Sequence, residues 1–252
     1  MVLAAIQKND QRTRLQERAC ALPIYSVTPF TMLDFPGKTA CIVWFSGCNM
    51  RCPYCHNPQI VKGKGRGDVG QVFDFLKKRA GLLDGVVLSG GEASAYPGLP
   101  DFIKQVKKLG YAVKLDTNGL RPDIIDDFLR QGFLNYIALD YKAPHHKFRQ
   151  VTGTYKYDLF SRTLDLLTTQ SDVTFELRTT VHTDLMDEDD VNEIILDLEQ
   201  RGYKGIHAIQ NFTHSDDRPT LGFMREQERL LNIGDIRKPH GFELQFRNFW
   251  NA

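Results

Sequence analysis

The sequence predicts an α/β fold, a partial (β/α)6 barrel in one domain. From about residue 39, short apolar or β-branched segments alternate with amphipathic segments of helical length, which is the pattern of a parallel sheet covered by helices. Six such units are fewer than the eight of a closed barrel, and neither end of the chain resembles a further unit. We therefore expect a single domain over residues 23–252 with a C-terminal tail, preceded by a charged extension over residues 1–22.

The expected strands are short and apolar, as strands buried on both faces of a parallel sheet are. They cover residues 39–45, 85–89, 112–117, 136–141, 174–181 and 205–211. Residues 243–247 alternate between polar and apolar side chains, which predicts one added strand near the end of the chain.

The expected helices show apolar residues at intervals of three and four. They cover residues 69–79, 99–109, 123–130, 159–169 and 189–201. The third is the clearest, because Pro122 precedes it and Gly132 stands where a C-terminal cap belongs.

Composition and charge exclude some functions. The chain is 42% hydrophobic and 25% charged with a formal net charge of +1, so it has no overall positive field for a phosphate backbone, and we expect no nucleic-acid partner. No apolar run approaches the roughly 20 residues of a membrane helix. We therefore expect a cytoplasmic protein that has no cleaved leader and no membrane partner.

Three of the five cysteines, Cys48, Cys52 and Cys55, form a C-x3-C-x2-C pattern directly after the first expected strand. Such a cluster fits a metal or cluster site better than a disulfide framework. Thiolates are the soft ligands of iron-sulfur clusters, and a cubane has four irons, so three thiolates leave one iron open for a ligand. Cys20 is most simply a tail thiol and Cys41 a buried strand residue.

Two other sites could use these cysteines. A zinc knuckle would need a fourth ligand, for which His56 is the candidate, but adjacent residues rarely reach the same metal. A bacterial-type ferredoxin loop has a C-x2-C-x2-C spacing followed by Cys-Pro, and the chain has neither feature.

The run 48–57, CNMRCPYCHN, resembles the signature loop of the radical S-adenosylmethionine (SAM) superfamily, including the aromatic Tyr54 before the last cysteine. The resemblance implies a 4Fe-4S cluster held by the three cysteines. It also implies that SAM binds the open iron and is reductively cleaved to methionine and a 5'-deoxyadenosyl radical.

Polar residues end the following strands, where α/β proteins bind ligands. Gly90, Gly91 and Glu92 resemble the family element that holds the methionine amino group, and glycines allow close approach of backbone. Further ends carry the groups Asp116-Thr117-Asn118 and Asp140-Tyr141-Lys142. By resemblance, Asp116, Thr117 and Asp140 would lie near a monovalent cation beside the cofactor, and Lys142 would contact the methionine carboxylate.

Two later strands carry the remaining candidates. Arg178 resembles a second carboxylate contact, and Gln210 lies in a segment that resembles the one against adenine in relatives. Ordinary alternatives stay open: Asp116 and Asp140 could simply end strands as turn residues, and Arg178 could be an exposed strand residue.

The lead 34–37, DFPG, resembles the Asp-x-Pro-Gly lead of activases for anaerobic ribonucleotide reductase and pyruvate formate-lyase. Over residues 24–215 the sequence most resembles the anaerobic ribonucleoside-triphosphate reductase activating proteins. This implies a glycyl radical enzyme as protein substrate and a flavodoxin or ferredoxin as electron donor. The alternatives are a small-molecule enzyme resembling 7-carboxy-7-deazaguanine synthase and a noncatalytic metal-binding module.

Overall fold

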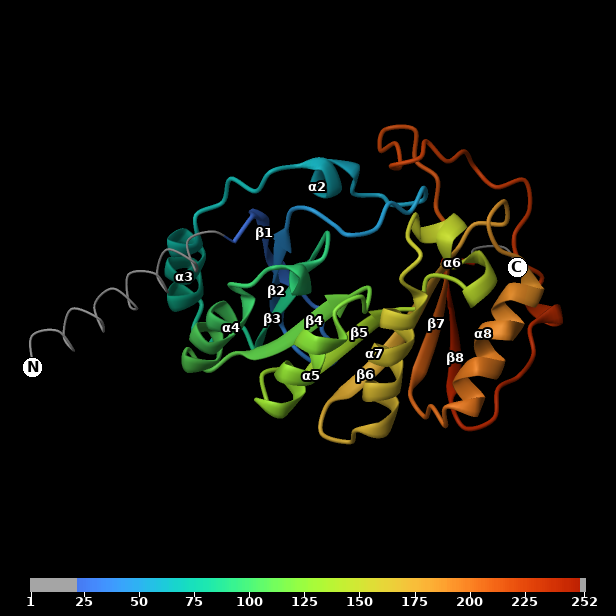
Figure 1. Ribbon diagram of the computed structural model, residues 1–252. Coiled ribbons are helices and arrows are strands. Elements are labelled where there is room, and N and C mark those ends of the chain that lie inside the picture. The colour runs from blue at the N-terminus through green and yellow to red at the C-terminus, as the bar shows by residue number, and fades with distance from the viewer. Residues whose placement is uncertain (1–21, 250–252) are drawn as a thin grey trace, which may run out of the picture.

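A computed structural model describes residues 22–249 of the chain. The expected extension, apart from its last residue, and Cys20 within it lie outside the described residues. The described chain forms one eight-stranded sheet with its strands side by side in sequence order, β1 to β8 (Figure 1). All neighbouring strands run parallel except the antiparallel pair β1 and β2. Because β1 and β8 form its two edges, the sheet is an open barrel, as predicted.

All seven predicted strands are present, with ends within one residue of those expected. They are β2 (Ala40–Phe45), β3 (Gly85–Gly90), β4 (Ala112–Thr117), β5 (Tyr136–Asp140), β6 (Thr174–Val181), β7 (Ile206–Asn211) and β8 (Glu243–Arg247). Val43, Leu88 and Leu115 are fully buried, which explains why the local pattern was so apolar.

The five predicted helices are also confirmed. They are α3 (Val69–Lys78), α4 (Leu99–Lys108), α5 (Pro122–Arg130), α7 (Tyr157–Thr169) and α8 (Glu188–Gln200). Helix α5 begins at Pro122, and Gly132 follows its end with a φ of 62°, a left-handed conformation that suits glycine. These helices follow one another along the outer side of the sheet (Figure 1).

Three elements were not predicted: β1 (Ile24–Thr31), α2 (Pro58–Lys62) and α6 (His145–Thr152). Pro29 interrupts β1, which is tolerable only because β1 is an edge strand and its register with β2 shifts between Thr28 and Thr31. The two helices are too short to show a clear helical period. Two 3-10 turns, η1 (Ala93–Ala95) and η2 (Ile233–Asp235), were not foreseen either.

The two faces of the sheet differ in character. The convex face packs on the helices and forms the main core, in which Phe45 contacts Phe102 of α4 with ring centroids 6.0 Å apart. The concave face has a small apolar cluster of Phe35, Ala40, Ile42 and Val87 near the amino ends of the strands. Polar side chains occupy the same face nearer the carboxyl ends, and they define the site described next.

Residues 22–249 contain no helix with the length and apolar character that crossing a bilayer requires.

Candidate active site

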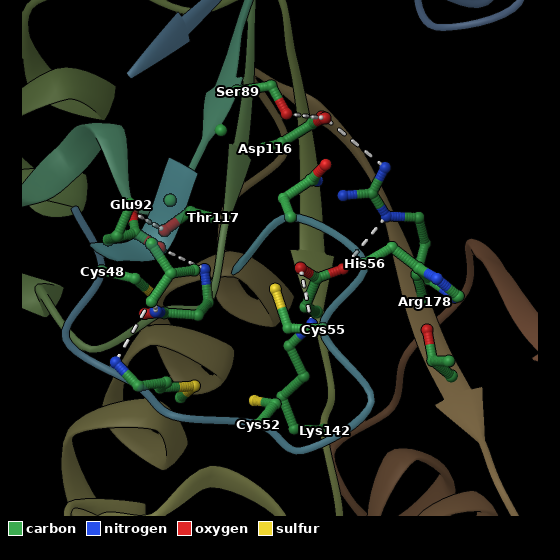
Figure 2. A pocket seen from close by; sticks show the side chains of 18 of the residues that line it. Cys48, Cys52, Cys55, His56, Ser89, Glu92, Asp116, Thr117, Lys142 and Arg178 are labelled. Atoms are coloured by element: carbon green, nitrogen blue, oxygen red, sulfur yellow. Dashed lines mark hydrogen bonds and ion pairs between the residues drawn. The ribbon is translucent and has the colours of Figure 1, made fainter. Parts of the chain in front are cut away.

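A pocket of about 310 Å³ lies at the carboxyl ends of the parallel strands. The cysteine loop that follows β2 lines it together with the ends of β3, β4, β5 and β6, and Figure 2 shows their side chains extending into it. It is lined by Asp34, Trp44, Cys48, Met50, Cys52, Tyr54, Cys55, His56, Asn57, Val61, Ser89, Gly90, Gly91, Glu92, Asp116, Thr117, Asn118, Asp140, Lys142, Arg178 and Thr180.

Backbone hydrogen bonds to α2, α6 and the C-terminal part of the chain hold the cysteine loop. The amide of Gly47 donates to the carbonyl of Ile60 in α2, and the amide of Arg51 donates to Thr152 at the end of α6, both at 2.8 Å. On the other side, the amide of Leu221 donates to the carbonyl of Cys55 at 2.9 Å. The loop is therefore fixed from three directions, although it has little regular structure of its own.

The three thiols of this loop are free and line the same pocket. Burial raises the pKa of Cys48 to about 11 and that of Cys52 to about 12. Thiolates here consequently need a positive partner, which the irons of a cluster would supply. Three soft donors around one pocket thus fit a 4Fe-4S cluster with one iron free of protein ligands.

The zinc alternative gains no support from the geometry. Within residues 22–249, no three Cys, His, Asp or Glu side chains lie close enough together to hold a single metal ion. His56, its candidate fourth ligand, instead stacks on Phe212, with ring centroids 5.0 Å apart and planes at 13°.

Gly90 and Gly91 allow the end of β3 to approach the cysteine loop. Gly90 has a φ of 124°, and a side chain on it would meet the backbone of Phe45. A side chain on Gly91 would collide with the carbonyl of Gly47. The amide of Gly91 also donates to Phe45 at 2.8 Å, and the amide of Glu92 donates to Gly47 at 2.9 Å. The two glycines therefore position the loop, whatever contact they make with a ligand.

Glu92 is 1% exposed, and its carboxylate already accepts four hydrogen bonds. Oε1 accepts from the amide and hydroxyl of Ser94 and from Thr117 Oγ1, and Oε2 accepts from the amide of Asn118 at 2.7 Å. Burial nevertheless raises the pKa of Glu92. The carboxylate joins the ends of β3 and β4, and its contact with a ligand ammonium remains a prediction.

Asn118 connects the end of β4 to the cysteine loop. Its Nδ2 donates to Asn49 Oδ1 at 2.7 Å and lies 3.8 Å from Cys48 Sγ. The side chain of Asn118 therefore restrains the first cysteine, a role that the resemblance did not imply.

Five charged side chains form a network on the concave face. Four lie on strands β4, β5 and β6 and one follows β5: Lys114, Asp116, Asp140, Arg178 and Lys142. Lys114 Nζ lies 2.6 Å from Asp116 Oδ1, and Arg178 Nη1 lies 3.6 Å from Asp116 Oδ2. Asp140 pairs with Arg178 Nε and Lys142 Nζ, each at 3.1 Å. Burial alone would raise the pKa of Asp140, but Lys142 and Arg178 hold it below its usual value. These residues are thus more than turn or surface residues.

The expected monovalent cation does not fit this arrangement. Asp116 and Asp140 are already paired with cationic side chains, so they do not offer the free carboxylate oxygens that a metal cation would need.

The pocket contains every predicted site residue except Gln210, which lies half-buried on β7 beside the pocket residue Thr180. The sequence alone did not indicate Trp44, Val61 and Thr180. Trp44 and Thr180 occupy concave-face positions of strands, which the alternation of side chains along β2 and β6 could have identified. The hydroxyl of Tyr54 is buried and has no hydrogen-bond partner among residues 22–249, which leaves it free to bond a ligand.

The model of the Radical SAM superfamily matches residues 42–199 of the chain. A Methanocaldococcus jannaschii protein provisionally described as a glycyl-radical enzyme activating enzyme is 28% identical over 231 residues, which cover 86% of this chain and 92% of that protein. The 7-carboxy-7-deazaguanine synthase of Aquifex aeolicus is 32% identical over 84 residues, which cover 33% of this chain and 37% of the synthase.

A solved structure shares the fold. Streptococcus suis SuiB bound to SAM superposes with a TM-score of 0.58 at 9% identity, over 82% of this chain and 52% of SuiB. The chain thus spans about half of that larger protein. The matched segment 42–199 contains the cysteine loop and the ends of β3 to β6 that form the pocket. The chain belongs to the radical SAM superfamily, whose members use a 4Fe-4S cluster and SAM as cofactors.

Proposed function

We propose that this chain is a glycyl-radical-enzyme activase, which uses SAM to install a radical on a glycine of a partner such as anaerobic ribonucleotide reductase. One observation carries the proposal: the likeness to the M. jannaschii protein, which is provisionally described as an activating enzyme, extends over nearly the whole length of both chains. The open side of the barrel between β1 and β8 supports it, because a loop of a large partner needs such an opening to reach the pocket.

Within this proposal, Cys48, Cys52 and Cys55 hold the cluster. When bound, the cluster supplies the electron that cleaves SAM to methionine and a 5'-deoxyadenosyl radical. Asn118 restrains Cys48 from the side of β4. The backbone hydrogen bonds to the cysteine loop keep the three thiols in the pocket. A flavodoxin or ferredoxin is the electron donor that the activase role implies.

The charged network orients the ligand. Lys142 and Arg178 line the pocket and provide ammonium and guanidinium donors for a carboxylate, which Arg binds in two-pronged geometry. Asp140 pairs with both and fixes their position. Tyr54, whose hydroxyl has no partner among the described residues, offers a further hydrogen bond beside the cysteines.

The test is to mix the reduced, anaerobically reconstituted protein with SAM and the glycyl radical enzymes of its own organism. We expect an organic radical by electron paramagnetic resonance on one partner, and its signal should broaden when that partner contains 13C-labelled glycine. A partner with the acceptor glycine replaced by alanine is the control and should give no signal. The absence of a radical on every such partner would refute the activase assignment.

The second candidate is a small-molecule enzyme, which the partial match to 7-carboxy-7-deazaguanine synthase favours. It predicts that 5'-deoxyadenosine accumulates only when a small substrate is added and that no protein radical forms. The same experiment therefore separates the two functions.

A further inference from the structure

The charged network contains an unusual buried lysine. The side chain of Lys114 on β4 is 2% exposed, and its Nζ lies 2.6 Å from Asp116 Oδ1 and 5.8 Å from the centre of the Tyr136 ring. A buried ammonium is stable only when it is paired, so this contact is a requirement of the fold and not a chance surface pair. Lys114 itself does not line the pocket, whereas Asp116 does.

Each carboxylate oxygen of Asp116 and Asp140 has a positive or hydroxyl neighbour. On Asp116, Oδ1 faces Lys114, and Oδ2 accepts from Ser89 Oγ at 2.9 Å. On Asp140, Oδ1 accepts from Arg178 and Oδ2 from Lys142. An alkali cation needs several oxygens at once, and here the strongest ones are engaged.

The charge balance points the same way. Within the network itself, Lys114, Lys142 and Arg178 face only two carboxylates, so these five side chains together carry one unit of positive charge. The neighbouring Glu176 is paired with Arg247 at 3.3 Å and does not change this balance. A metal cation would add like charge in a poorly solvated place, while a ligand carboxylate would neutralise the excess.

We propose that Lys114 is a built-in counter-ion: its ammonium takes the place of a monovalent metal cation beside Asp116, so the site binds SAM without such a cation. Lys114 is in this sense a positioning residue, because it acts through Asp116, which in turn faces Arg178 and Ser89 in the pocket. The inference concerns the SAM pocket and holds whichever partner or substrate receives the radical.

The experiment measures SAM binding by the reconstituted, cluster-containing protein using equilibrium dialysis. Binding is compared in N-methylglucamine chloride, NaCl and KCl at one ionic strength. For the unaltered protein we expect dissociation constants that agree within about twofold in the three salts. A dissociation constant about fivefold or more lower in NaCl or KCl would overturn the proposal, because it would reveal a required alkali cation.

Substituting Lys114 tests directly whether its ammonium replaces a metal cation. Lys114→Met removes the ammonium while keeping its bulk, so binding in N-methylglucamine chloride should weaken by about tenfold and recover in part in NaCl or KCl. Equal binding by Lys114→Met and the unaltered protein in all three salts would also overturn the proposal. The exposed Lys108→Met is the matched control and should bind normally.

If Lys114→Met alone fails to fold, the double variant Lys114→Met/Asp116→Asn removes both charges and avoids an unpaired buried carboxylate. We expect this double variant to show no response to alkali cations. A response in the double variant would contradict the proposed exchange of lysine for metal, since no carboxylate would remain at Asp116 to attract the cation.

Discussion

The amide of Leu221 donates a hydrogen bond to the carbonyl of Cys55 at 2.9 Å, and thereby joins the C-terminal part of the chain to the cysteine loop. The next residue repeats the contact, since the amide of Gly222 donates to Pro53 at 2.8 Å. We call residues 220–223 the strap. This segment lies about 165 residues from the loop in sequence, so the cluster site depends on a contact that no local motif encodes.

The strap should tolerate no side chain at Gly222. A Cβ there would lie 2.5 Å from Pro53 Cβ and 2.8 Å from Pro53 Cα, and backbone atoms cannot easily move aside. We expect Gly222→Ala to destabilise the reconstituted protein by about 1–3 kcal/mol, the usual cost of overpacking, and to lower its iron content. Urea unfolding and iron analysis measure the two effects.

Gly70→Ala is the matched control for the strap. Gly70 lies in the first turn of α3, and a Cβ there would meet only the Asp68 side chain at 3.2 Å. Alanine is favoured over glycine in helices by roughly 0.5–1 kcal/mol, so this variant should keep its iron and its stability. If Gly222→Ala behaved like Gly70→Ala, the strap would have no part in holding the loop.

Cys52 should be needed for iron binding, and Cys41 should not. Cys52 lies in the pocket at 7% exposure, while Cys41 is fully buried on β2 and does not line the pocket. We expect Cys52→Ala to lose most of its iron on anaerobic reconstitution, because two thiolates cannot hold a cubane securely. Cys41→Ala should keep the full iron content and lose only about 1 kcal/mol of stability through a small cavity. Full iron content in Cys52→Ala would rule out its role as a ligand.

The sequence predicted the parallel part of the fold well because its signals are local. Buried strands such as β3 and amphipathic helices such as α5 have patterns that are visible within ten residues. Strand β1 was missed because it is an edge strand interrupted by Pro29, and α6 because eight residues show barely two turns. Tertiary contacts stabilise both elements: β1 pairs with β2, and the amide of Arg51 donates to Thr152 of α6.

For the site, the cysteine spacing and the resemblance to the radical SAM superfamily proposed residues that all line the pocket except Gln210. The resemblance agrees with the rule that ligands bind at strand ends. The pairings among these residues could not be predicted. Nothing in the sequence around Lys114 indicated that its side chain is buried. Its ion pair with Asp116 depends on both side chains pointing to the concave face. Two of the four hydrogen bonds of Glu92, those from Thr117 and Asn118, likewise depend on how β3 and β4 meet.

Glu92 should be needed as a carboxylate. An amide has one acceptor oxygen, so in Glu92→Gln the new NH2 group would face the backbone amide of Asn118, and a buried donor would lose its partner. Although burial raises the pKa of Glu92, we expect this variant to be less stable by about 1–3 kcal/mol in urea unfolding. The exposed Glu226→Gln is the control and should be neutral. Equal stability of the two variants would show that the Glu92 network contributes little.

The free energy of unfolding should vary with pH because of Glu188. Its carboxylate accepts hydrogen bonds from Arg229 at 2.7 and 2.9 Å and from the amide of Asn232 at 2.7 Å. Arg229 lowers the pKa of Glu188 from its usual 4.5 to about 2. The ionised Glu188 therefore contributes fully to the free energy of unfolding above pH 4.5, and this contribution is lost as the pH falls toward 2. Because Arg229 is half exposed, we expect Glu188→Gln to cost only about 1 kcal/mol near neutral pH. Urea unfolding should show this difference at about pH 6 and a smaller one at about pH 3.5. Asp189→Asn removes an exposed charge from the same turn of α8, so a similar loss in that variant would assign the effect to the helix dipole instead.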